Sequence, residues 1–327
     1  MNEMMRALWL TILLAVVAFG ANAAAKETDG EALYEKGYIL YQQRHYGAAR
    51  EIFERAAKAG EPEAAYYVGE LERLSHTFMT KEAEKWYRQA AAGGDVYAMV
   101  RLANADICAG LGDCDIDKDE WFQKALNIAL PKAKSGNIDS MNDLYVIYSV
   151  MGDDDEAWGW LNKAASNGHL FAQYWLSYLI EKGKGFYWTE DGRIEDSIKW
   201  MRKSAEGGFP RAMVELALLL KDQGDLKGAW NWLERASNTN YIRGIYEYAA
   251  ALIKGPEGKF KIPSKDEAKG YALFLELKQK TDSDVANDFA DFYKDKISSD
   301  SLIQAKSMVG DLLVDEPIIY YDPKFGL

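Results

Sequence analysis

Histidine and cysteine, the residue types that most often hold metals or act as nucleophiles, are scarce in this sequence. Its 327 residues include three histidines and two cysteines, and His45, His76 and His169 lie far apart along the chain. No His-x-x-x-His pair, Gly-x-Ser-x-Gly turn or phosphate-binding glycine loop occurs. Carboxylates are numerous, but no pattern places two of them in an apolar pocket. The sequence therefore predicts a protein that is not an enzyme, with no catalytic residue, metal site or cofactor.

Proline is also rare, and basic residues are outnumbered by acidic ones. Seven prolines leave room for many helices, because proline interrupts a helix interior. The 39 Lys and Arg against 51 Asp and Glu give a net charge of −12. This balance disfavours a nucleic-acid partner, whose phosphates require basic groups, and an anionic membrane surface. It suits a basic protein partner, which opposite charge attracts during encounter. The alternative is that the acidic charge serves solubility alone.

Long apolar runs are absent beyond the amino terminus. Ala7–Phe19 is an apolar run of 13 residues, too short to cross a bilayer core of about 30 Å as a helix. Arg6 precedes it, and the small-x-small sequence Ala21-Asn22-Ala23 follows. These features predict a secretory signal peptide at 1–23, with an uncleaved anchor as the alternative. After cleavage we expect no integral membrane segment and a location in the periplasm of a Gram-negative bacterium or outside a cell.

One short phrase recurs along most of the chain. Within Asp155–Ala172 it combines an Ala-x-x-Trp pair, a Lys-Ala-Ala run, a glycine and a final small residue. Stronger and weaker copies recur at steps of 32 to 42 residues, beginning at Ala49, Ala83, Ala125, Ala157, Ser197, Ala229 and Ala268. A period of this length, built from two helical segments, indicates a stacked array of helical repeats.

Each repeat is predicted to be a hairpin of two helices, because apolar residues recur at helical spacing in both halves. The first helices are expected near 31–43, 62–74, 95–108, 138–150, 170–182, 210–222 and 241–254. The second helices are expected near 47–59, 80–92, 118–134, 153–166, 193–206, 225–237 and 265–279, with Pro131 kinking or shortening its helix. A last amphipathic pair is expected at 282–295 and 299–313.

These elements predict the domain organisation of the chain. A short polar leader at 24–30 follows the signal peptide, and an array of about seven repeats occupies 31–280. Capping helices are expected at 281–313, and 314–327 is expected to be an extended tail packed on the last repeat.

The repeated phrase resembles the Sel1-like repeat (SLR) family, which is related to tetratricopeptide repeats. The pattern of that family runs from a small residue through a Leu-Gly-like pair, a Tyr and a Gly-x-Gly loop to Ala-x-x-Trp, Ala-Ala and Gly. In one unit the matching residues are Ala172, Leu176, Gly183-Lys184-Gly185, Trp200, Ala205 and Gly208. The resemblance covers roughly 31–280, although Tyr145 and Ser177 replace the family's Gly and Asn240 replaces the closing Gly.

The resemblance implies an all-α fold, a right-handed α-solenoid superhelix of helix-turn-helix repeats. It further implies that the first helices line a concave face that binds proteins, and it implies no enzymatic reaction.

Cys108 and Cys114, both in a loop between predicted helices, are expected to form a disulfide in an oxidising compartment, with two free thiols as the alternative. The alternating carboxylates of Asp113–Asp119 resemble the start of a calcium loop. However, Lys118 stands where such a loop needs Gly, and Lys124 where it needs Glu. A solvated loop before a helix is therefore the preferred interpretation.

If the first helices follow tetratricopeptide geometry, their exposed inner positions form an aromatic surface with interspersed acid. Tyrosine is favoured at binding hot spots because it gives a large contact area at low entropic cost. The predicted partner-binding residues are Tyr34, Tyr38, Tyr41, Tyr66, Glu70, Tyr97, Phe171, Tyr174, Tyr178, Glu181 and Tyr246. For Tyr66, Tyr174 and Tyr246, a packing role is an equal alternative. The convex face, the loop at 108–120 and the C-terminal tail are also open as binding sites.

The export signal, the repeat scaffold and the acidic balance favour a secreted protein that binds and inhibits a protein partner. Periplasmic SLR proteins include immunity proteins that neutralise type VI secretion effectors, notably phospholipase toxins, and this chain looks like such an antidote. Its partner would be a secreted toxin with basic or apolar features, and not a nucleic acid. A scaffold or adaptor for envelope protein complexes is the alternative. A cell-wall-active enzyme, as proposed for SLR proteins with a cysteine pair in many repeats, ranks last because this chain has one pair.

Overall fold

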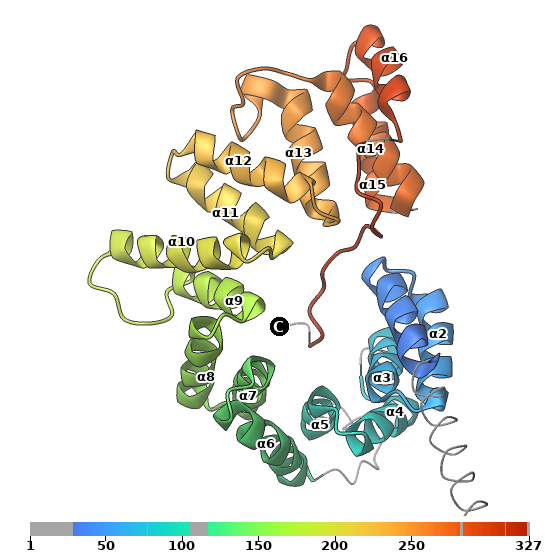
Figure 1. Cartoon of the computed structure of the whole chain (residues 1–327), viewed down its shortest axis with the longest axis vertical. Helices are drawn as coiled ribbons and strands as arrows, with labels where there is room; N and C mark the ends of the chain where they lie inside the picture. Colours follow the sequence, from blue (N-terminus) through green and yellow to red (C-terminus); the bar gives the residue numbers. More distant parts are fainter. Residues whose placement is uncertain (1–28, 77, 105–116, 282–283, 311, 326–327) are drawn as a thin grey trace, which may run out of the picture. The chain divides into compact units, whose positions relative to one another are not determined.

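The computed structural model describes residues 29–76, 78–104, 117–281, 284–310 and 312–325, and within these ranges it consists of helices and short connections (Figure 1). The chain forms two compact units, Met1–Ile128 and Ala129–Leu327. The boundary between them falls inside α6 (Lys118–Lys134). The predicted all-α repeat fold is confirmed in both units.

In the first unit, a helix over residues 29–42 is followed by four helices and the start of α6. The four are α2 (Tyr46–Ala59), α3 (Pro62–His76), α4 (Lys81–Ala92) and α5 (Val96–Ala103). From α2 to α5, each helix packs on the next. The pairs α3/α4 and the earlier 29–42/α2 are the predicted hairpins.

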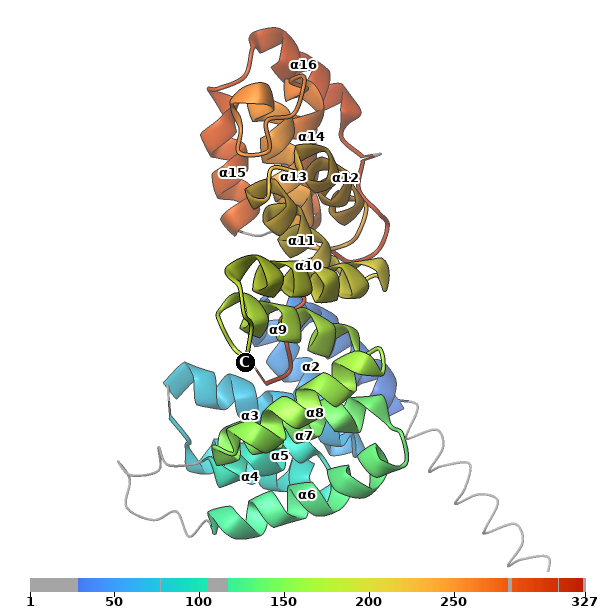
Figure 2. The same ribbon diagram turned by 90° about the vertical axis from the view of Figure 1, so that its left-hand side faces the viewer.

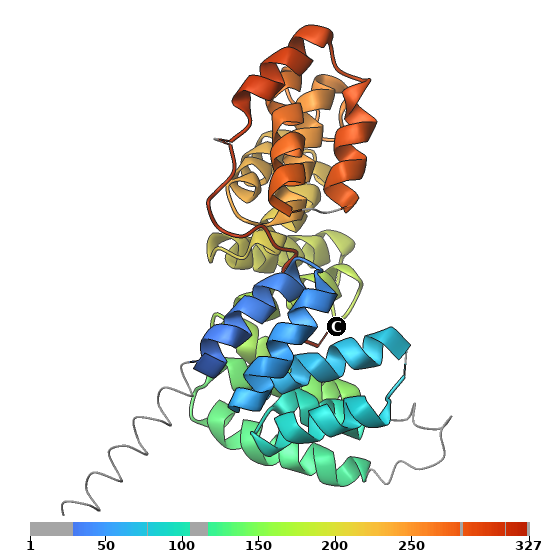
Figure 3. The same ribbon diagram turned by 90° about the vertical axis from the view of Figure 1, so that its right-hand side faces the viewer.

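The second unit continues the same pattern. Its helices are α7 (Ile138–Met151), α8 (Asp154–Ser166), α9 (Leu170–Glu181), α10 (Glu190–Glu206), α11 (Pro210–Asp222), α12 (Leu226–Ser237), α13 (Ile242–Lys254), α14 (Glu267–Thr281), α15 (Asp284–Lys294) and α16 (Ser299–Met308), with a 3-10 turn at Gly255–Glu257. Each helix from α7 to α14 packs on its successor, while both α15 and α16 pack on α14. Figure 2 shows these helices layered from α8 to α16, and Figure 3 shows the orange and red helices α14 to α16 grouped together.

Helix boundaries follow local chemistry. The side chains of Thr80, Asn137 and Asp153 each accept a hydrogen bond from the backbone N–H three residues on, which satisfies a donor that the first turn leaves unpaired. α7 ends at Gly152, whose φ of +82° is a left-handed conformation that glycine adopts without a steric penalty.

Four boundary predictions need correction. α5 ends at Ala103, before the expected 108, with Asn104 as its C-cap residue. α10 begins at Glu190, earlier than 193, because Thr189 caps it by accepting from the Gly192 N–H. α16 ends at Met308, before the expected 313, since Gly310 turns the chain with a φ of +119°. Pro131 does not shorten α6, which continues to Lys134; proline removes one donor, but its carbonyl still accepts from the Ser135 N–H at 3.1 Å.

In two hairpins, a glycine in the first helix leaves room for an aromatic ring of the second helix to pack directly against the backbone. A Cβ added to Gly37 would lie 2.7 Å from the Phe53 ring, and one added to Gly69 would lie 2.8 Å from the Tyr87 ring. Both rings are fully buried. The two helices of these hairpins therefore approach more closely than larger residues would allow.

The repeated Ala-x-x-Trp phrase lies between helices, as predicted. Trp160 is 7% exposed, and Ala164 and Ala165 are fully buried. The Trp160 Nε1–H donates to the Glu156 carboxylate at 3.0 Å, and the Lys163 ammonium lies 3.9 Å from the centre of the indole ring. The equivalent residues Trp86 and Trp232 are buried as well. No helix within the described ranges is both long enough and apolar enough to span a bilayer.

Replacing Trp160 by Ala should lower the free energy of unfolding by about 3–5 kcal/mol, because it truncates a large buried side chain. Urea unfolding followed by far-UV circular dichroism would measure this loss. Trp188→Ala is the matched control, because Trp188 is 91% exposed and its truncation should change stability by less than about 0.5 kcal/mol. Equal losses in the two variants would contradict the buried role of Trp160.

Candidate protein-binding surface

Three of the predicted binding residues form an aromatic cluster in the first unit. Tyr34, Tyr38 and Tyr41, all on the helix over residues 29–42, are half-buried around the Tyr67 ring. Their ring centroids lie 6.2, 5.7 and 4.9 Å from that of Tyr67, which in turn stacks on Phe53. Burial, followed by the nearby Glu63 carboxylate, raises the pKa of Tyr34 above its usual range. The cluster offers neutral phenol edges on a rigid base, which suits contact with an apolar or hydrogen-bonding protein surface.

The structure buries both Tyr66, for which packing was an equal alternative, and Glu70, whose predicted exposure is wrong. Tyr66 is fully buried, and Glu70 is 3% exposed because two guanidinium groups and a phenol surround its carboxylate. Arg101 donates from Nε and Nη2 at 2.6 and 3.0 Å, Arg73 from Nη2 at 3.0 Å, and the Tyr87 hydroxyl at 2.6 Å. This network joins α3, α4 and α5, so Glu70 has a packing role in place of partner contact. The groups that donate to Glu70 were not apparent from helical spacing alone.

Tyr97 is the other predicted residue next to this network. It lies on α5 and is partly exposed, with its ring centroid 6.3 Å from that of Tyr66. The structure thus places Tyr66, Glu70 and Tyr97 close together, but leaves only Tyr97 with accessible surface.

In the second unit, α9 presents a row of three stacked aromatic rings. Phe171 and Trp175 are stacked with centroids 6.2 Å apart, and Trp175 and Tyr178 are stacked at 5.0 Å. Tyr178 is 37% exposed, and the other two are partly exposed. Trp175 is absent from the predicted set, although its i+4 spacing from Phe171 places it on the same helix face. Its indole N–H donates to the Tyr145 hydroxyl on α7, which fixes the row in place.

Two other predicted residues of α9 lie off this row. Tyr174 is buried, with its ring 5.5 Å from that of Phe209 and the Arg211 guanidinium 5.4 Å above it. The packing alternative therefore describes Tyr174. Glu181 is partly exposed at the end of α9 and forms an ion pair with Lys182 at 3.1 Å.

His169 determines where α9 begins. Its Nδ1 accepts a hydrogen bond from the Ala172 N–H at 3.0 Å, a role that requires the neutral imidazole. Burial lowers the pKa of His169, and the nearby Asp139 opposes that shift only in part. The neutral ring can therefore cap the helix that carries the aromatic row.

Tyr246 of α13 is half-buried against the capping helices. Its ring stacks on Phe289 of α15 at 5.1 Å. Burial raises the pKa of Tyr246 to about 12. This contact matches the packing alternative for Tyr246 more closely than a role in partner contact.

The C-terminal tail runs from α14 past the start of α13 to α11 (Figure 1). It therefore extends beyond the last repeat, on which it was expected to pack. Near α14 the buried Glu276 carboxylate accepts from the N–H groups of Leu312 and Leu313 at 3.1 and 3.2 Å. Farther on, Ile319 forms a parallel β-bridge beside Tyr241. The Ile319 N–H donates to the Asn240 carbonyl at 2.9 Å, and the Ile242 N–H donates to the Ile319 carbonyl at 3.1 Å.

Side chains at the amino-terminal ends of α11 and α13 complete this tail contact. Asn240 donates from Nδ2 to the Pro317 carbonyl at 3.0 Å and accepts from the Tyr321 hydroxyl at 2.7 Å. Arg211 donates from Nη1 to the Tyr321 carbonyl at 3.1 Å. The Tyr321 ring meets the edges or faces of Phe209 and Tyr241 nearly at right angles. This surface therefore binds an extended segment mainly through its main chain, with one aromatic ring held between two others.

Cys108, Cys114 and the carboxylates of Asp113–Asp115 lie outside the described residues, so their predicted roles stay predictions. Among the residues that the structure describes, no group of three or more His, Cys, Asp or Glu side chains is placed to hold a metal ion.

The sequence identity between this chain and known proteins is low. No family model matches the chain. A chitin synthase regulator of Saccharomyces cerevisiae is 24% identical over 196 residues, which cover 59% of this chain and 22% of that protein. The chain thus spans less than a quarter of the length of that curated relative.

Two solved structures resemble the chain. One is a protective antigen of uropathogenic Escherichia coli displaying an SLR fold; it is 17% identical, with a TM-score of 0.46, and the match covers 87% of this chain and 61% of that chain. The other is a Sel1 repeat protein from Oxalobacter formigenes; it is 20% identical, with a TM-score of 0.43, and the match covers 88% of this chain and 86% of that chain. Both are repeat proteins of the kind that the sequence pattern resembles.

Glu70→Gln should destabilise the protein by about 3–5 kcal/mol, because it leaves two largely buried guanidinium groups without their counter-charge. Glu82→Gln is the control, since Glu82 is 45% exposed and pairs with an exposed Lys85; its loss should be below about 1 kcal/mol. Urea unfolding would compare the two. A Glu70→Gln protein as stable as Glu82→Gln would show that the network contributes nothing to the fold.

Asn240→Ala should release the end of the tail, because it removes the amide that bonds to Pro317 and Tyr321. Two hydrogen bonds of about 1 kcal/mol each correspond to tail opening roughly thirtyfold more often. Chymotryptic cleavage after Tyr320 and Tyr321, followed by mass spectrometry, should accelerate accordingly. Asn238→Ala, on the exposed Asn238, is the control. Unchanged cleavage in Asn240→Ala would mean that Asn240 does not hold the tail.

Proposed function

We propose that this chain is a periplasmic protein-binding repeat protein, and specifically an immunity protein that binds and inhibits a type VI secretion effector of phospholipase type. The observation that carries the proposal is the tail contact. The surface at the amino-terminal ends of α11 and α13 already holds an extended polypeptide through main-chain hydrogen bonds. A surface of that kind is suited to protein partners.

Accessible aromatic surface supports the same function. The row of Phe171, Trp175 and Tyr178 is stacked and tied to α7, so little side-chain entropy would be lost when a partner covers it. Aromatic side chains of this kind supply much of the free energy in protein interfaces. The net charge of −12 would speed the encounter with a basic toxin.

The periplasmic location rests on the predicted signal peptide at 1–23, which lies outside the described residues. A toxin that attacks the membrane from the periplasm must be neutralised there, so export and inhibition belong to one proposal. Inhibition would follow from tight association that covers the active site or the membrane-facing surface of the toxin.

One observation favours the adaptor as a second candidate. The two units each carry their own accessible aromatic cluster, the first around Tyr38 and Tyr41 and the second along α9. Two such surfaces would allow two partners of moderate affinity, as an envelope scaffold requires.

Expression in the periplasm of a toxin gene adjacent to this one tests the proposal. Cells that carry the chain should survive, and cells that lack it should lyse. The mature protein and the toxin should co-elute as a 1:1 complex in size-exclusion chromatography with light scattering. Cells that die equally with and without the chain would refute the immunity function. Recovery of several envelope proteins, in place of one toxin, would favour the adaptor.

A further inference from the structure

The connection between α9 and α10 holds the most exposed aromatic side chains among the described residues. Phe186 is 77% exposed and Trp188 is 91% exposed, and their rings meet edge to face with centroids 5.2 Å apart. Large apolar side chains at this exposure gain nothing for the fold, since burial is what makes them stabilising. Two adjacent ones on a single loop are typical of a contact surface.

The loop that presents them is fixed on both sides. Between the two rings, Tyr187 points back, and its hydroxyl donates to the Asp196 carboxylate at 2.8 Å. Burial and this hydrogen bond raise the pKa of Tyr187 to about 12. Arg193 donates to the last carbonyls of α9 at Ile180 and Glu181. A loop tied in this way orders the backbone that carries Phe186 and Trp188 before a partner arrives, which reduces the entropic cost of binding.

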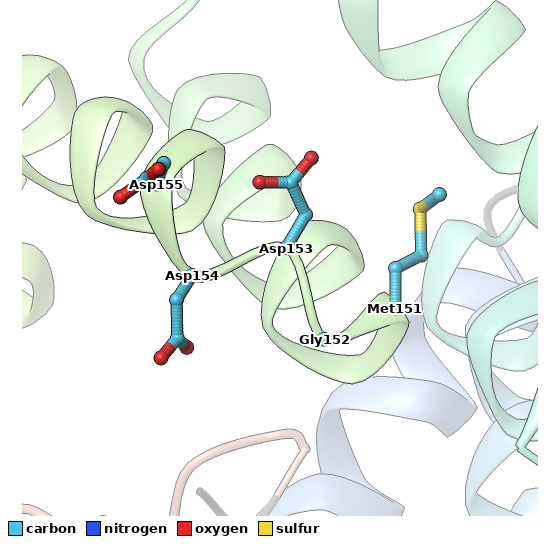
Figure 4. A pocket seen from close by; sticks show the side chains of 5 residues that line it. All are labelled: Met151, Gly152, Asp153, Asp154 and Asp155. Atoms are coloured by element: carbon cyan, nitrogen blue, oxygen red, sulfur yellow. The ribbon is translucent and has the colours of Figure 1, made fainter.

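A second loop lies beside the first. The Lys184 ammonium forms an ion pair with the Asp154 carboxylate at 3.1 Å, and Gly185 lies against the ring of Trp158 on α8. These contacts bring the connection between α7 and α8 next to the aromatic loop. That connection lines an open pocket of about 580 Å³, formed by Met151, Gly152, Asp153, Asp154 and Asp155 (Figure 4).

The neighbouring charge is strongly acidic. Across 151–156 and 181–193 there are seven carboxylates, two lysines and one arginine. The three cations already form ion pairs with Glu181, Asp154 and Glu190. Figure 4 shows the side chains of Met151 and Asp153 on the same side of the loop. The surface formed by these two loops therefore combines exposed aromatic rings with a net negative charge.

We infer that this aromatic–acidic edge, formed by Phe186, Trp188, Met151, Asp153 and Asp155, is the docking surface for a protein partner whose apolar pocket is bordered by Lys and Arg. Apolar rings fill the pocket, and the carboxylates face its basic rim. The inference rests on the proposed binding function and names the surface and the chemistry of its partner.

Charge complementarity selects this occupant over three others. An anionic lipid headgroup and a nucleic-acid phosphate are both repelled by the carboxylates around the rings. A second copy of the chain docked through the same edge would bring like charges together, which is costly in an interface. A basic protein surface gains from both the rings and the charge.

The experiment immobilises the full mature chain and exposes it to a cell-envelope extract of its own organism, with quantitative mass spectrometry of the retained proteins. Four forms are compared: wild type, Phe186→Ala/Trp188→Ala, Asp153→Asn/Asp155→Asn, and Ile303→Ala as the control. Ile303 is also exposed and apolar, but lies on α16 away from the edge. All four should melt at nearly the same temperature, because the altered side chains are exposed and Asn can replace Asp153 as the N-cap of α8.

We expect one protein with a basic surface to be retained by wild type and Ile303→Ala. Its retention should fall at least tenfold with Phe186→Ala/Trp188→Ala. With Asp153→Asn/Asp155→Asn, retention should fall severalfold at 50 mM salt and change little at 500 mM salt, because screening removes the charge contribution.

The other outcomes overturn the inference in distinguishable ways. A partner retained equally by Phe186→Ala/Trp188→Ala would overturn the docking surface and leave the binding function standing. Retention of no protein by any form would overturn both. Binding to vesicles of phosphatidylethanolamine and phosphatidylglycerol that is lost in Phe186→Ala/Trp188→Ala would assign the rings to a membrane. A dimer in sedimentation that is lost in the same variant would assign them to a second copy.

Discussion

The close approach of two helices within each hairpin is the constraint on which the rest of the structure depends. Gly37 and Gly69 show it most directly, because an aromatic ring of the following helix occupies the space that a Cβ would fill. This contact buries the rings of Phe53 and Tyr87 completely. It also fixes which face of the first helix turns away from its partner helix, and on that face lie the residues that are available for binding.

Most of the fold could be predicted from the sequence because the features that define each repeat lie close together along the chain. Capping residues and turn glycines set the helix ends, and the burial of Trp160 and Ala164 follows from helical spacing. The binding surface was harder to predict because exposure depends on residues far along the chain. Glu70 is buried by Arg101, which lies 31 residues later, and helical periodicity contains no information about that pair. Trp175 was missed although its spacing from Phe171 was available.

Departures from the repeat pattern coincide with the specific contacts of the second unit. Tyr145 stands where the SLR pattern has a glycine, and its hydroxyl accepts from Trp175 and fixes the aromatic row. Ser177, at the equivalent place in the next repeat, donates to the Ser197 carbonyl at 2.7 Å in a buried contact between α9 and α10. Asn240 replaces a closing glycine and binds the tail. Each departure from the repeat pattern thus gives its repeat a contact that the neighbouring repeats lack.

In the second unit, the tail contact and the aromatic–acidic edge lie at opposite ends of different first helices. The tail contacts the amino-terminal ends of α11 and α13, whereas the edge follows the carboxyl ends of α7 and α9. A partner that competed for the tail surface would first have to break the hydrogen bonds at Asn240 and Arg211, and that cost would be subtracted from its binding free energy. A partner at the edge breaks no such contact, because the rings of Phe186 and Trp188 are already exposed on a loop that Tyr187 ties to α10. At equal contact area, a partner at the edge would therefore bind more tightly than a partner at the tail surface.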